Sequence, residues 1–478
     1  WRSSDSGLLW VSAGPGCGKS VLSRALIDEQ RLSVNVAAST VCYFFFKDGD
    51  EHRIYATNAL SAILHQIFTH ASSSDLIEHA IASHQNFGRD LTKNFPELWR
   101  ILIRCAESPN AGEIVCVLDA LDECDAGNRQ QLIRKLEKLY CQKIRGSDSR
   151  PKLKFLITSR PYDDLEESFS AFSDTIAYVH FDGDEKAAQI SKEINLVIDV
   201  KVDGIARRFG EEDRRRIAER LKSMEHRTYL WLHLTFNIIE QRPGKYSRRS
   251  DVEALLSDLP VQVSEAYEKF LNRSEDQLQT ETLLQIVLAA ARPLRLDEAN
   301  VALTIAMEDG RFDSYSALQS KMWSRENFES TVKYLCGLFI SVHENKLFFI
   351  HQTAREFLLH HERKGNWQDR LDLTRSHAKM VSICLKYMSC LDGQELYEMK
   401  DNCPLAAYAS EHWMDHARLS ETEKDVQEDV LRFFLEDKQA FKVWSKLFSP
   451  DDPRSRYPII GSSPHPPLYY ASAAGLQD

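Results

Sequence analysis

The sequence contains no apolar run long enough to cross a membrane. A membrane-spanning helix needs about 18 or more consecutive apolar residues, and no stretch of the 478 residues approaches that length. A signal peptide is also missing from the amino end. We therefore expect no membrane segment. The chain lacks an initiating Met as well, so we expect Trp1 to be a cut end of a longer protein.

Paired cysteines and an excess of basic residues are missing too. The ten cysteines include no Cys-x-x-Cys pair, which predicts reduced thiols in a cytoplasmic protein rather than disulfides or zinc. With 60 Lys and Arg against 71 Asp and Glu, the net charge is −11, which argues against a general nucleic-acid surface. The short basic runs at 214–216 and 248–249 are usually solvated helix faces, although a local patch stays open.

Glycine is scarce, with 19 in the chain, yet three glycines fall within one loop. This loop follows an apolar, strand-like run at 8–11 and precedes a helical pattern at 21–26; it reads Gly14-Pro15-Gly16-Cys17-Gly18-Lys19-Ser20. Strand, loop and helix in this order let backbone N–H groups converge on phosphate oxygens. Lys19 would reach the β- and γ-phosphates, and the Ser20 hydroxyl would ligate Mg²⁺. The alternative is a glycine-rich turn that binds nothing, and Ala13 stands where the strict motif has its first glycine.

An acidic residue at the end of a second buried strand would complete a Mg²⁺ site. The apolar run 114–118 predicts such a strand, and Asp119 at its carboxyl end would hold Mg²⁺ through water. Asp122 or Glu123 would then orient the attacking water, because phosphoryl transfer needs a positioned nucleophile. Read alone, this acidic turn could also be a solvated loop.

A third strand-like run, 153–157, leads into Thr158-Ser159-Arg160-Pro161. The Arg160 guanidinium could sense the charge of a γ-phosphate. The alternative is a surface arginine that precedes a proline turn.

These motifs resemble a known family. GPGCGKS, VCVLDALDE and FLITSRP, in this order and spacing, resemble the NACHT nucleotide-binding domains of STAND signalling ATPases. LLWVSAGPGCGKSVLSRAL and VCYFFFKDGDEHR are similar to the fungal branch, whose members are NLR-like proteins. The resemblance implies a switch that ADP holds closed and that oligomerises and signals after exchange for ATP, with Mg²⁺ as the metal.

The order of the patterns predicts an α/β P-loop NTPase core, a parallel sheet with flanking helices, followed by helical and winged-helix domains and a further α-helical region. Strand-like runs stop near residue 181, and apolar residues at helical spacing follow over 185–209 and 212–239. We expect a nucleotide-binding domain at 1–182, a helical domain at 183–259, a winged-helix domain at 260–362, a helical region at 363–448, a linker at 449–466 and a possible ankyrin repeat start at 467–478.

Two aromatic or histidine-containing segments have two interpretations each. Residues 229–232, Tyr-Leu-Trp-Leu, line the adenine or, more often for such a pattern, belong to a helical core. His351 follows the second strand of an expected hairpin, 338–342 and 346–350, and opens a helix at 352–359. The family resemblance implies that this histidine contacts the ADP β-phosphate, but Gln352 stands where relatives have Asp. A structural role for His351 is equally open.

The last residues resemble the opening of an ankyrin repeat, although a helix start with small residues would explain them almost as well. A single repeat cannot bury its own apolar face, so we expect a poorly packed tail and further repeats that bind a protein ligand.

The patterns favour a signalling switch that hydrolyses ATP slowly and controls self-association, in a response of the innate-immunity or incompatibility type. One alternative is a turnover enzyme such as a P-loop kinase or GTPase, but no [NT]-K-x-D guanine motif follows the acidic strand. Another is a scaffold whose P-loop no longer binds nucleotide.

Overall fold

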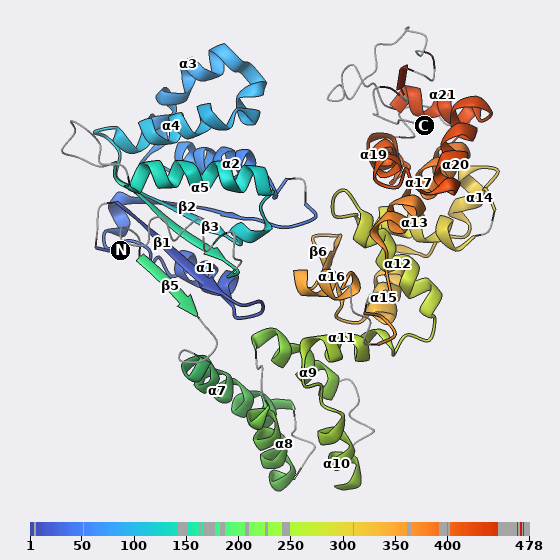
Figure 1. Ribbon diagram of the computed structural model, residues 1–478, viewed down its shortest axis with the longest axis horizontal. Helices are drawn as coiled ribbons and strands as arrows, with labels where there is room; N and C mark the ends of the chain where they lie inside the picture. The colour runs from blue at the N-terminus through green and yellow to red at the C-terminus, as the bar shows by residue number, and fades with distance from the viewer. Residues whose placement is uncertain are drawn as a thin grey trace. The chain divides into compact units, whose positions relative to one another are not determined.

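The computed structural model of the chain divides into two compact units, Trp1–Val261 and Gln262–Asp478 (Figure 1). The structure describes all residues except 4–5, 51, 142–150, 162–164, 166–176, 182–186, 206–209, 225–227, 241–248, 309, 361–364, 369, 392–398, 400–401, 448–465, 467–468, 471 and 473–478. The expected linker at 449–466 lies outside the described residues apart from Pro466. Within the part of the chain that is described, no helix is both long and apolar enough to cross a membrane.

A five-stranded parallel sheet forms the centre of the amino-terminal unit, as far as the residues are described. Its strands, in chain order, are β1 (Gly7–Ala13), β2 (Ser39–Phe45), β3 (Glu113–Asp119), β4 (Leu153–Ser159) and β5 (Ala177–Phe181). Their order across the sheet is β2-β3-β4-β1-β5. Because all the strands run in the same direction, the carboxyl ends of β1, β3 and β4 meet at one edge, where open α/β sheets bind their ligands.

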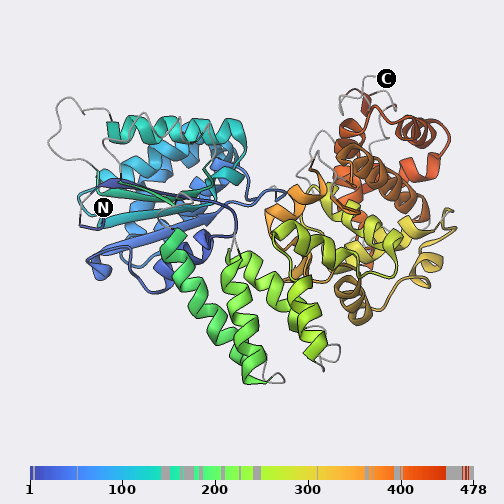
Figure 2. The ribbon, with the colours of Figure 1, turned by 60° about the horizontal axis from the view of Figure 1, so that its bottom comes forward.

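Helices cover both faces of this sheet, which explains the long apolar runs in its strands. The buried Lys154 of β4 is an exception, and it pairs with Glu113 of β3. One face carries α2 (Ala56–Thr69), α4 (Phe95–Glu107) and α5 (Ala126–Cys141), and the other carries α1 (Lys19–Asp28) (Figures 1 and 2). In strand β3, successive side chains point to opposite faces of the sheet and so belong to different cores. Ile114 and Cys116 belong to the larger core with α2 and α4, whereas Val115 and Val117 belong to the core beside α1. Helix α3 (Glu78–Phe87) contacts α4.

The rest of this unit is helical, but it divides differently from the sequence pattern. Its helices are α7 (Ala187–Ile205), α8 (Glu211–Ser223), α9 (Tyr229–Glu240) and α10 (Arg249–Asp258). The stretch 212–239, which has continuous helical spacing, is therefore two helices. The reason is local: the Thr228 hydroxyl accepts a hydrogen bond from the Trp231 N–H at 3.1 Å, and a side chain that caps in this way begins a new helix.

The carboxy-terminal unit begins with a winged-helix arrangement. Its elements are α11 (Val263–Leu271), α12 (Gln277–Ala289), α13 (Leu296–Met307), α14 (Tyr315–Gln319), α15 (Arg325–Cys336), the hairpin strands β6 (Ile340–His343) and β7 (Lys346–Phe349), and α16 (Gln352–Leu358). The strands are joined by a two-residue turn, Glu344 and Asn345, both with positive φ, rather than by the expected three residues. Tyr267 packs against Phe339 and Phe357 in the core of this arrangement.

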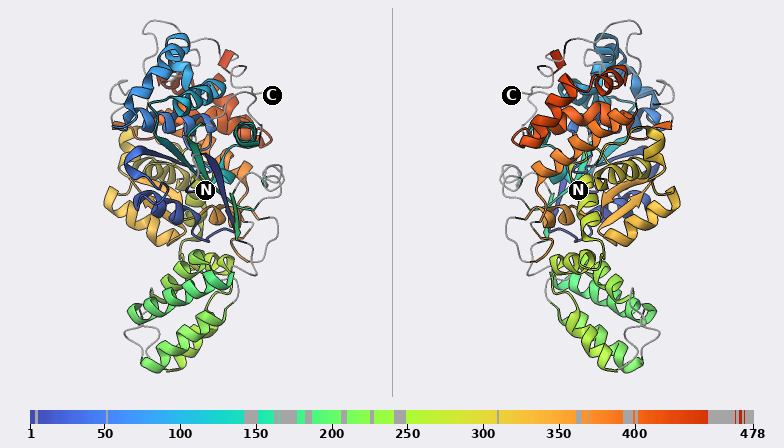
Figure 3. Two further views of the ribbon diagram at one scale, coloured as in Figure 1. Left: turned by 90° about the vertical axis from the view of Figure 1, so that its left-hand side faces the viewer. Right: turned by 90° about the vertical axis from the view of Figure 1, so that its right-hand side faces the viewer.

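The last helices are α17 (Leu373–Cys390), α19 (Ala406–Leu419), α20 (Lys424–Leu435) and α21 (Lys438–Leu447). Helix α17 is central, because it contacts α12, α13, α19, α20 and α21; Figure 3 gives further views of these helices. Of the expected repeat start, the structure describes Tyr469, Tyr470 and Ser472. The Tyr470 ring is buried 4.8 Å from the ring of Trp444, so this residue is packed, whereas we expected a loose tail.

Candidate functional site

The loop between β1 and α1 has the backbone geometry of a phosphate cradle. Gly16 and Gly18 have φ values of 73° and 84°, a region that residues with a Cβ rarely adopt. Gly18 is the N-cap residue of α1, so no N-cap side chain bonds to the first turn of this helix. The amino end of α1 therefore presents backbone N–H groups of the kind that bind phosphate. This observation fits the expected nucleotide phosphates.

Lys19 and Ser20 occupy the first turn of α1, as the motif predicts. The Lys19 ammonium donates hydrogen bonds to the carbonyls of Ala13 at 2.7 Å and Gly14 at 3.0 Å, so its side chain folds over the loop. Burial lowers the pKa of Lys19, and the nearby Asp122 carboxylate opposes this effect. Ser20 is exposed at the same turn. Burial also raises the pKa of the Cys17 thiol, which favours the neutral form.

Asp119 is fixed at the carboxyl end of β3 by two hydroxyl groups. Its Oδ1 atom accepts hydrogen bonds from Ser23 of α1 and Thr158 of β4, both at 2.7 Å. Asp119 is only 1% exposed, and Oδ2 has no hydrogen-bond partner among the described residues. The carboxylate is therefore fixed through Oδ1, and Oδ2 is the oxygen that the predicted metal-bound water would contact. The contacts of Ser23 and Thr158 with Asp119 were not predicted, although both residues lie within motifs quoted from the sequence.

A sharp change of direction follows Asp119. Ala120 has a φ of 55°, in the left-handed region, and its N–H donates to the Thr158 hydroxyl at 3.0 Å. A one-turn 3₁₀ helix, Leu121–Glu123, comes next. Left-handed backbone at a residue other than glycine is strained and clusters at functional sites. Here the left-handed Ala120 places Asp122 and Glu123 directly after β3, the strand that ends in Asp119.

Asp122 and Arg160 form a buried pair. The Asp122 Oδ1 atom accepts from the Arg160 N–H at 3.1 Å, and Oδ2 lies 3.3 Å from the Arg160 Nε atom. Burial raises the pKa of Asp122, while the charges of Arg160 and Lys19 oppose the rise. Asp122 therefore orients Arg160 rather than facing solvent. Of the two candidates for orienting water, this arrangement favours Glu123.

Glu123 lies in an environment that disfavours its charge. Burial raises its pKa to about 7, and the Asp122 carboxylate adds to the rise. The Asp48 N–H, in the loop after β2, donates to the Glu123 Oε2 atom at 3.0 Å and favours the ionised form. A carboxyl group that titrates near neutrality is suited to exchange protons with water. The contact with Asp48 was not predicted, because the two residues lie 75 positions apart.

The amino end of α9 packs directly on the phosphate loop. A Cβ atom on Gly16 would lie 2.8 Å from the Leu230 Cβ atom, and one on Gly18 would lie 3.4 Å from the Tyr229 ring. Trp231 and Leu232, by contrast, are buried, and the Trp231 indole donates to the Pro260 carbonyl. The four-residue segment is therefore divided: its first two residues contact the loop, and its last two belong to the helical core.

His351 lies in the carboxy-terminal unit and caps α16. Its Nδ1 atom accepts a hydrogen bond from the Thr353 N–H at 3.2 Å. Because Nδ1 is the acceptor, the proton of the neutral ring lies on Nε2. This cap gives His351 a structural role, and its contact with ADP stays a prediction.

Three family models match successive parts of the chain. Residues 1–160 match the model described as Nephrocystin 3, N-terminal. Residues 190–258 match a domain of unknown function (DUF7069), and residues 267–368 match the winged-helix domain of GPI inositol-deacylase.

One curated protein and two solved structures are similar to the chain. The vegetative incompatibility protein HET-E-1 of Podospora anserina is 26% identical over 364 residues, which are 74% of this chain and 24% of that protein. The chain thus spans about a quarter of the length of that relative.

The solved structures are the Walker-type ATPase PABY2304 of Pyrococcus abyssi and the ORC1 protein of Aeropyrum pernix in complex with DNA. Both are 14% identical with a TM-score of 0.28; they cover 74% and 73% of this chain, and 90% and 85% of their own chains. The fold assignment rests on the sheet and the family models. The sheet, the family models and the similarity to the incompatibility protein together confirm the resemblance that the motifs predict. This chain carries a P-loop NTPase domain followed by a winged-helix domain.

Proposed function

We propose that this chain is a nucleotide-dependent switch of the STAND type, which binds ADP and ATP with Mg²⁺ and hydrolyses ATP slowly. The observation that supports it best is the meeting of Lys19, Asp119 and the Asp122–Arg160 pair at one edge of the sheet. In the proposed switch, nucleotide state controls self-association in an incompatibility-like response.

Each residue has a distinct task in this proposal. The Lys19 ammonium exchanges the carbonyls of Ala13 and Gly14 for phosphate oxygens, to which a cation binds more strongly than to neutral carbonyls. The Ser20 hydroxyl would ligate Mg²⁺, and the second carboxylate oxygen of Asp119 would hold this ion through a bound water. When bound, this ion neutralises charge on the terminal phosphates. Gly16 and Gly18 adopt the positive φ values that the loop needs, and their lack of a side chain leaves room for the first turn of α9.

Glu123 orients the attacking water and takes up its proton, and Arg160 senses the terminal phosphate. With a pKa of about 7, Glu123 is only partly ionised at neutral pH, which is consistent with slow turnover. Hydrolysis should therefore increase as pH rises through about 7.

Calorimetric titration with ADP and ATP tests the proposed site. Lys19→Ala removes the cation that faces the phosphates, so we expect binding to weaken at least about tenfold. Lys138→Ala, an exposed lysine on α5, is the matched control and should bind as the wild type does. Equal affinity of the wild type and Lys19→Ala would contradict the cradle. No binding of ADP or ATP by the wild type would favour the scaffold alternative.

Light scattering tests the switch. We propose that His351 contacts the ADP β-phosphate in a closed state, so that His351→Ala favours the self-associating form. Because this residue also caps α16, Thr353→Ala is the control: it removes the hydroxyl beside the ring and leaves the imidazole in place. If His351→Ala stays as monomeric as the wild type with ADP and with ATP, the histidine is structural only.

A further inference from the structure

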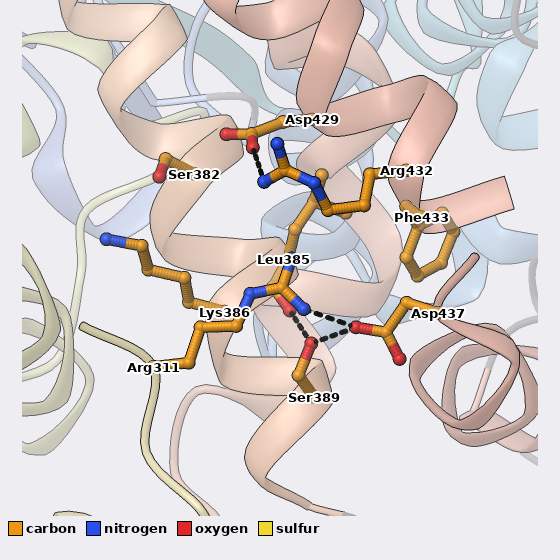
Figure 4. A pocket seen from close by; sticks show the side chains of 9 residues that line it. All are labelled: Arg311, Ser382, Leu385, Lys386, Ser389, Asp429, Arg432, Phe433 and Asp437. Atoms are coloured by element: carbon orange, nitrogen blue, oxygen red, sulfur yellow. Dashed lines mark hydrogen bonds and ion pairs between the residues drawn. The ribbon is translucent and has the colours of Figure 1, made fainter. Parts of the chain in front are cut away.

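A small pocket lies in the carboxy-terminal unit, between α17, α20 and the loop that precedes α14. It has a volume of about 40 Å³. Ser382, Leu385, Lys386 and Ser389 of α17 line it at positions i, i+3, i+4 and i+7, which share one face of a helix. Figure 4 shows these side chains together with the others that line the pocket: Arg311, Asp429, Arg432, Phe433 and Asp437.

The two carboxylates of the pocket have structural partners. The Asp437 Oδ1 atom accepts from the Ala440 N–H at 3.0 Å and so caps α21, while Oδ2 accepts from Arg311 and from Ser389, each at 2.8 Å (Figure 4). Asp429 accepts from Arg432, one turn along α20, at 3.2 Å. These bonds fix Arg311 and Arg432 at the rim, where they remain 42% and 45% exposed.

Lys386 supplies a third positive charge to the same pocket. It is half-buried, and no carboxylate pairs with it in the described part of the chain. The pocket therefore holds three cations against two carboxylates, and both carboxylates are already bonded. Because both guanidinium groups are paired with carboxylates, Lys386 gives the lining side chains a net charge of +1, which favours an anion. The pocket thus has an uncompensated positive charge and hydrogen-bond donors that face a cavity.

We propose that this pocket binds one phosphate group, carried by a phosphomonoester or present as inorganic phosphate. A guanidinium has a planar fork of N–H donors that matches phosphate oxygens, and Arg311 and Arg432 line the same pocket as Lys386. The volume of about 40 Å³ has room for about three waters, which phosphate oxygens replace. A phosphate monoester carries more negative charge and more acceptor oxygens than a carboxylate, so it can contact more of these donors. The Ser382 hydroxyl is a further donor.

This site is independent of the phosphate loop, and the experiment separates the two. Calorimetry uses the Lys19→Ala chain, so that the loop does not bind the probe, and titrates it with inorganic phosphate and with phosphoserine. In this background, Lys386→Ala should weaken binding at least about tenfold, because it removes a charge-assisted hydrogen bond. Lys442→Ala, an exposed lysine of α21 outside the pocket, removes the same charge and should leave binding unchanged. Asp429→Asn should tighten binding, because it removes a competing carboxylate.

A second measurement applies to the unmodified chain. Phosphate should reduce the acetylation of Lys386 by acetic anhydride, read by mass spectrometry, and leave that of Lys442 unchanged. Tighter binding of phosphoserine than of inorganic phosphate would assign the site to an organic phosphomonoester, and the reverse order would assign it to the free anion. No binding, or equal binding by Lys386→Ala and its control, would overturn the proposal and leave the pocket a structural ion-pair cluster.

Discussion

The amino-terminal unit buries charged side chains at one edge of its sheet, whereas the carboxy-terminal unit buries neutral histidines between helices. Burial shifts the pKa values of Asp122, Glu123 and Lys19 toward their uncharged forms, although a ligand would use the charged forms. Between α17 and α19, burial is part of the packing, because His377 and His416 complete a hydrogen-bond chain. Buried ionisable groups thus indicate a candidate site in one unit and a core in the other, and only their partners distinguish the two cases.

The histidine chain requires uncharged rings. Tyr408 accepts from the Ala291 N–H at 2.9 Å and donates to the His416 Nε2 atom at 2.8 Å. The His416 Nδ1 atom then carries the proton and donates to the His377 Nδ1 atom, also at 2.8 Å. A proton on both Nδ1 atoms would leave two donors facing each other. Burial lowers the pKa of His416 to about 3, and that of the neighbouring His412 to about 4.

The largest expected effect is a loss of stability of the carboxy-terminal unit in acid. The unfolded chain protonates these histidines near pH 6.5, whereas the folded unit does not, so stability is complete above that pH and falls as the pH decreases. For His412 and His416 together, we expect a loss of about 5 kcal/mol by pH 4.5. Hydrogen exchange of α17 amides measures it without assuming that both units unfold together.

His416→Gln separates this effect from general acid unfolding. Its starting stability should be lower, but its loss between pH 6.5 and 4.5 should be about half that of the wild type, because one titrating ring is gone. His343→Gln is the matched control, because the His343 side chain is 77% exposed on the hairpin. An identical pH slope in all three proteins would show that the buried rings do not determine it.

The second effect has the opposite sign and belongs to the amino-terminal unit. Glu123 ionises near pH 4.5 in the unfolded chain and near 7 in the folded one, so its contribution to stability falls as the pH rises between these values and is constant above them. Glu123→Gln removes this dependence. Relative to the wild type, its free energy of unfolding should increase by about 3 kcal/mol between pH 4.5 and 8.

Hydrogen exchange of β3 amides measures this change, and Glu137→Gln on the exposed side of α5 is the control. The same variant should lose ATP hydrolysis. If Glu123→Gln keeps full hydrolysis, another residue orients the attacking water. If its free energy of unfolding depends on pH as that of the wild type does, Glu123 does not cause the opposite pH dependence of the two units.

The smallest effect concerns how the candidate site is held. Thr158→Val removes one of two donors to the buried Asp119 and the acceptor of the Ala120 N–H, so we expect a loss of about 1–3 kcal/mol in stability. Mg²⁺-dependent binding of nucleotide should weaken with it. Thr69→Val, whose hydroxyl bonds to its own exposed helix, is the control. Unchanged Mg²⁺ dependence would mean that Ser23 alone positions the carboxylate.

The local sequence predicts part of this molecule well, for physical reasons. Strands β1, β3 and β4 contain runs of apolar residues on both faces because helices cover both faces of the sheet. The phosphate loop could be found because its function needs small residues at fixed spacing. The expected fold class is confirmed, including the winged helix.

The rest depends on contacts between residues that are distant in sequence. Asp48 and Glu123 approach each other only because β2 and β3 are neighbours in the sheet. The break before α9 at Thr228 has no glycine or proline to mark it. The unusual environment of His416 comes from His377, 39 positions earlier, on another helix. No pattern in the local sequence carries this information.

The seam between Gly16 and Leu230 has a mechanical consequence. Because Gly16 has no side chain, the backbone of the phosphate loop packs directly against the first turn of α9. A shift of the loop should therefore move this turn by a similar amount. Helix α9 has 12 residues and is therefore about 18 Å long. On a rod of that length, a tilt of about 10° at the loop displaces the far end by about 3 Å. The contact of Gly16 with Leu230 is therefore the point about which a shift of the phosphate loop would tilt α9.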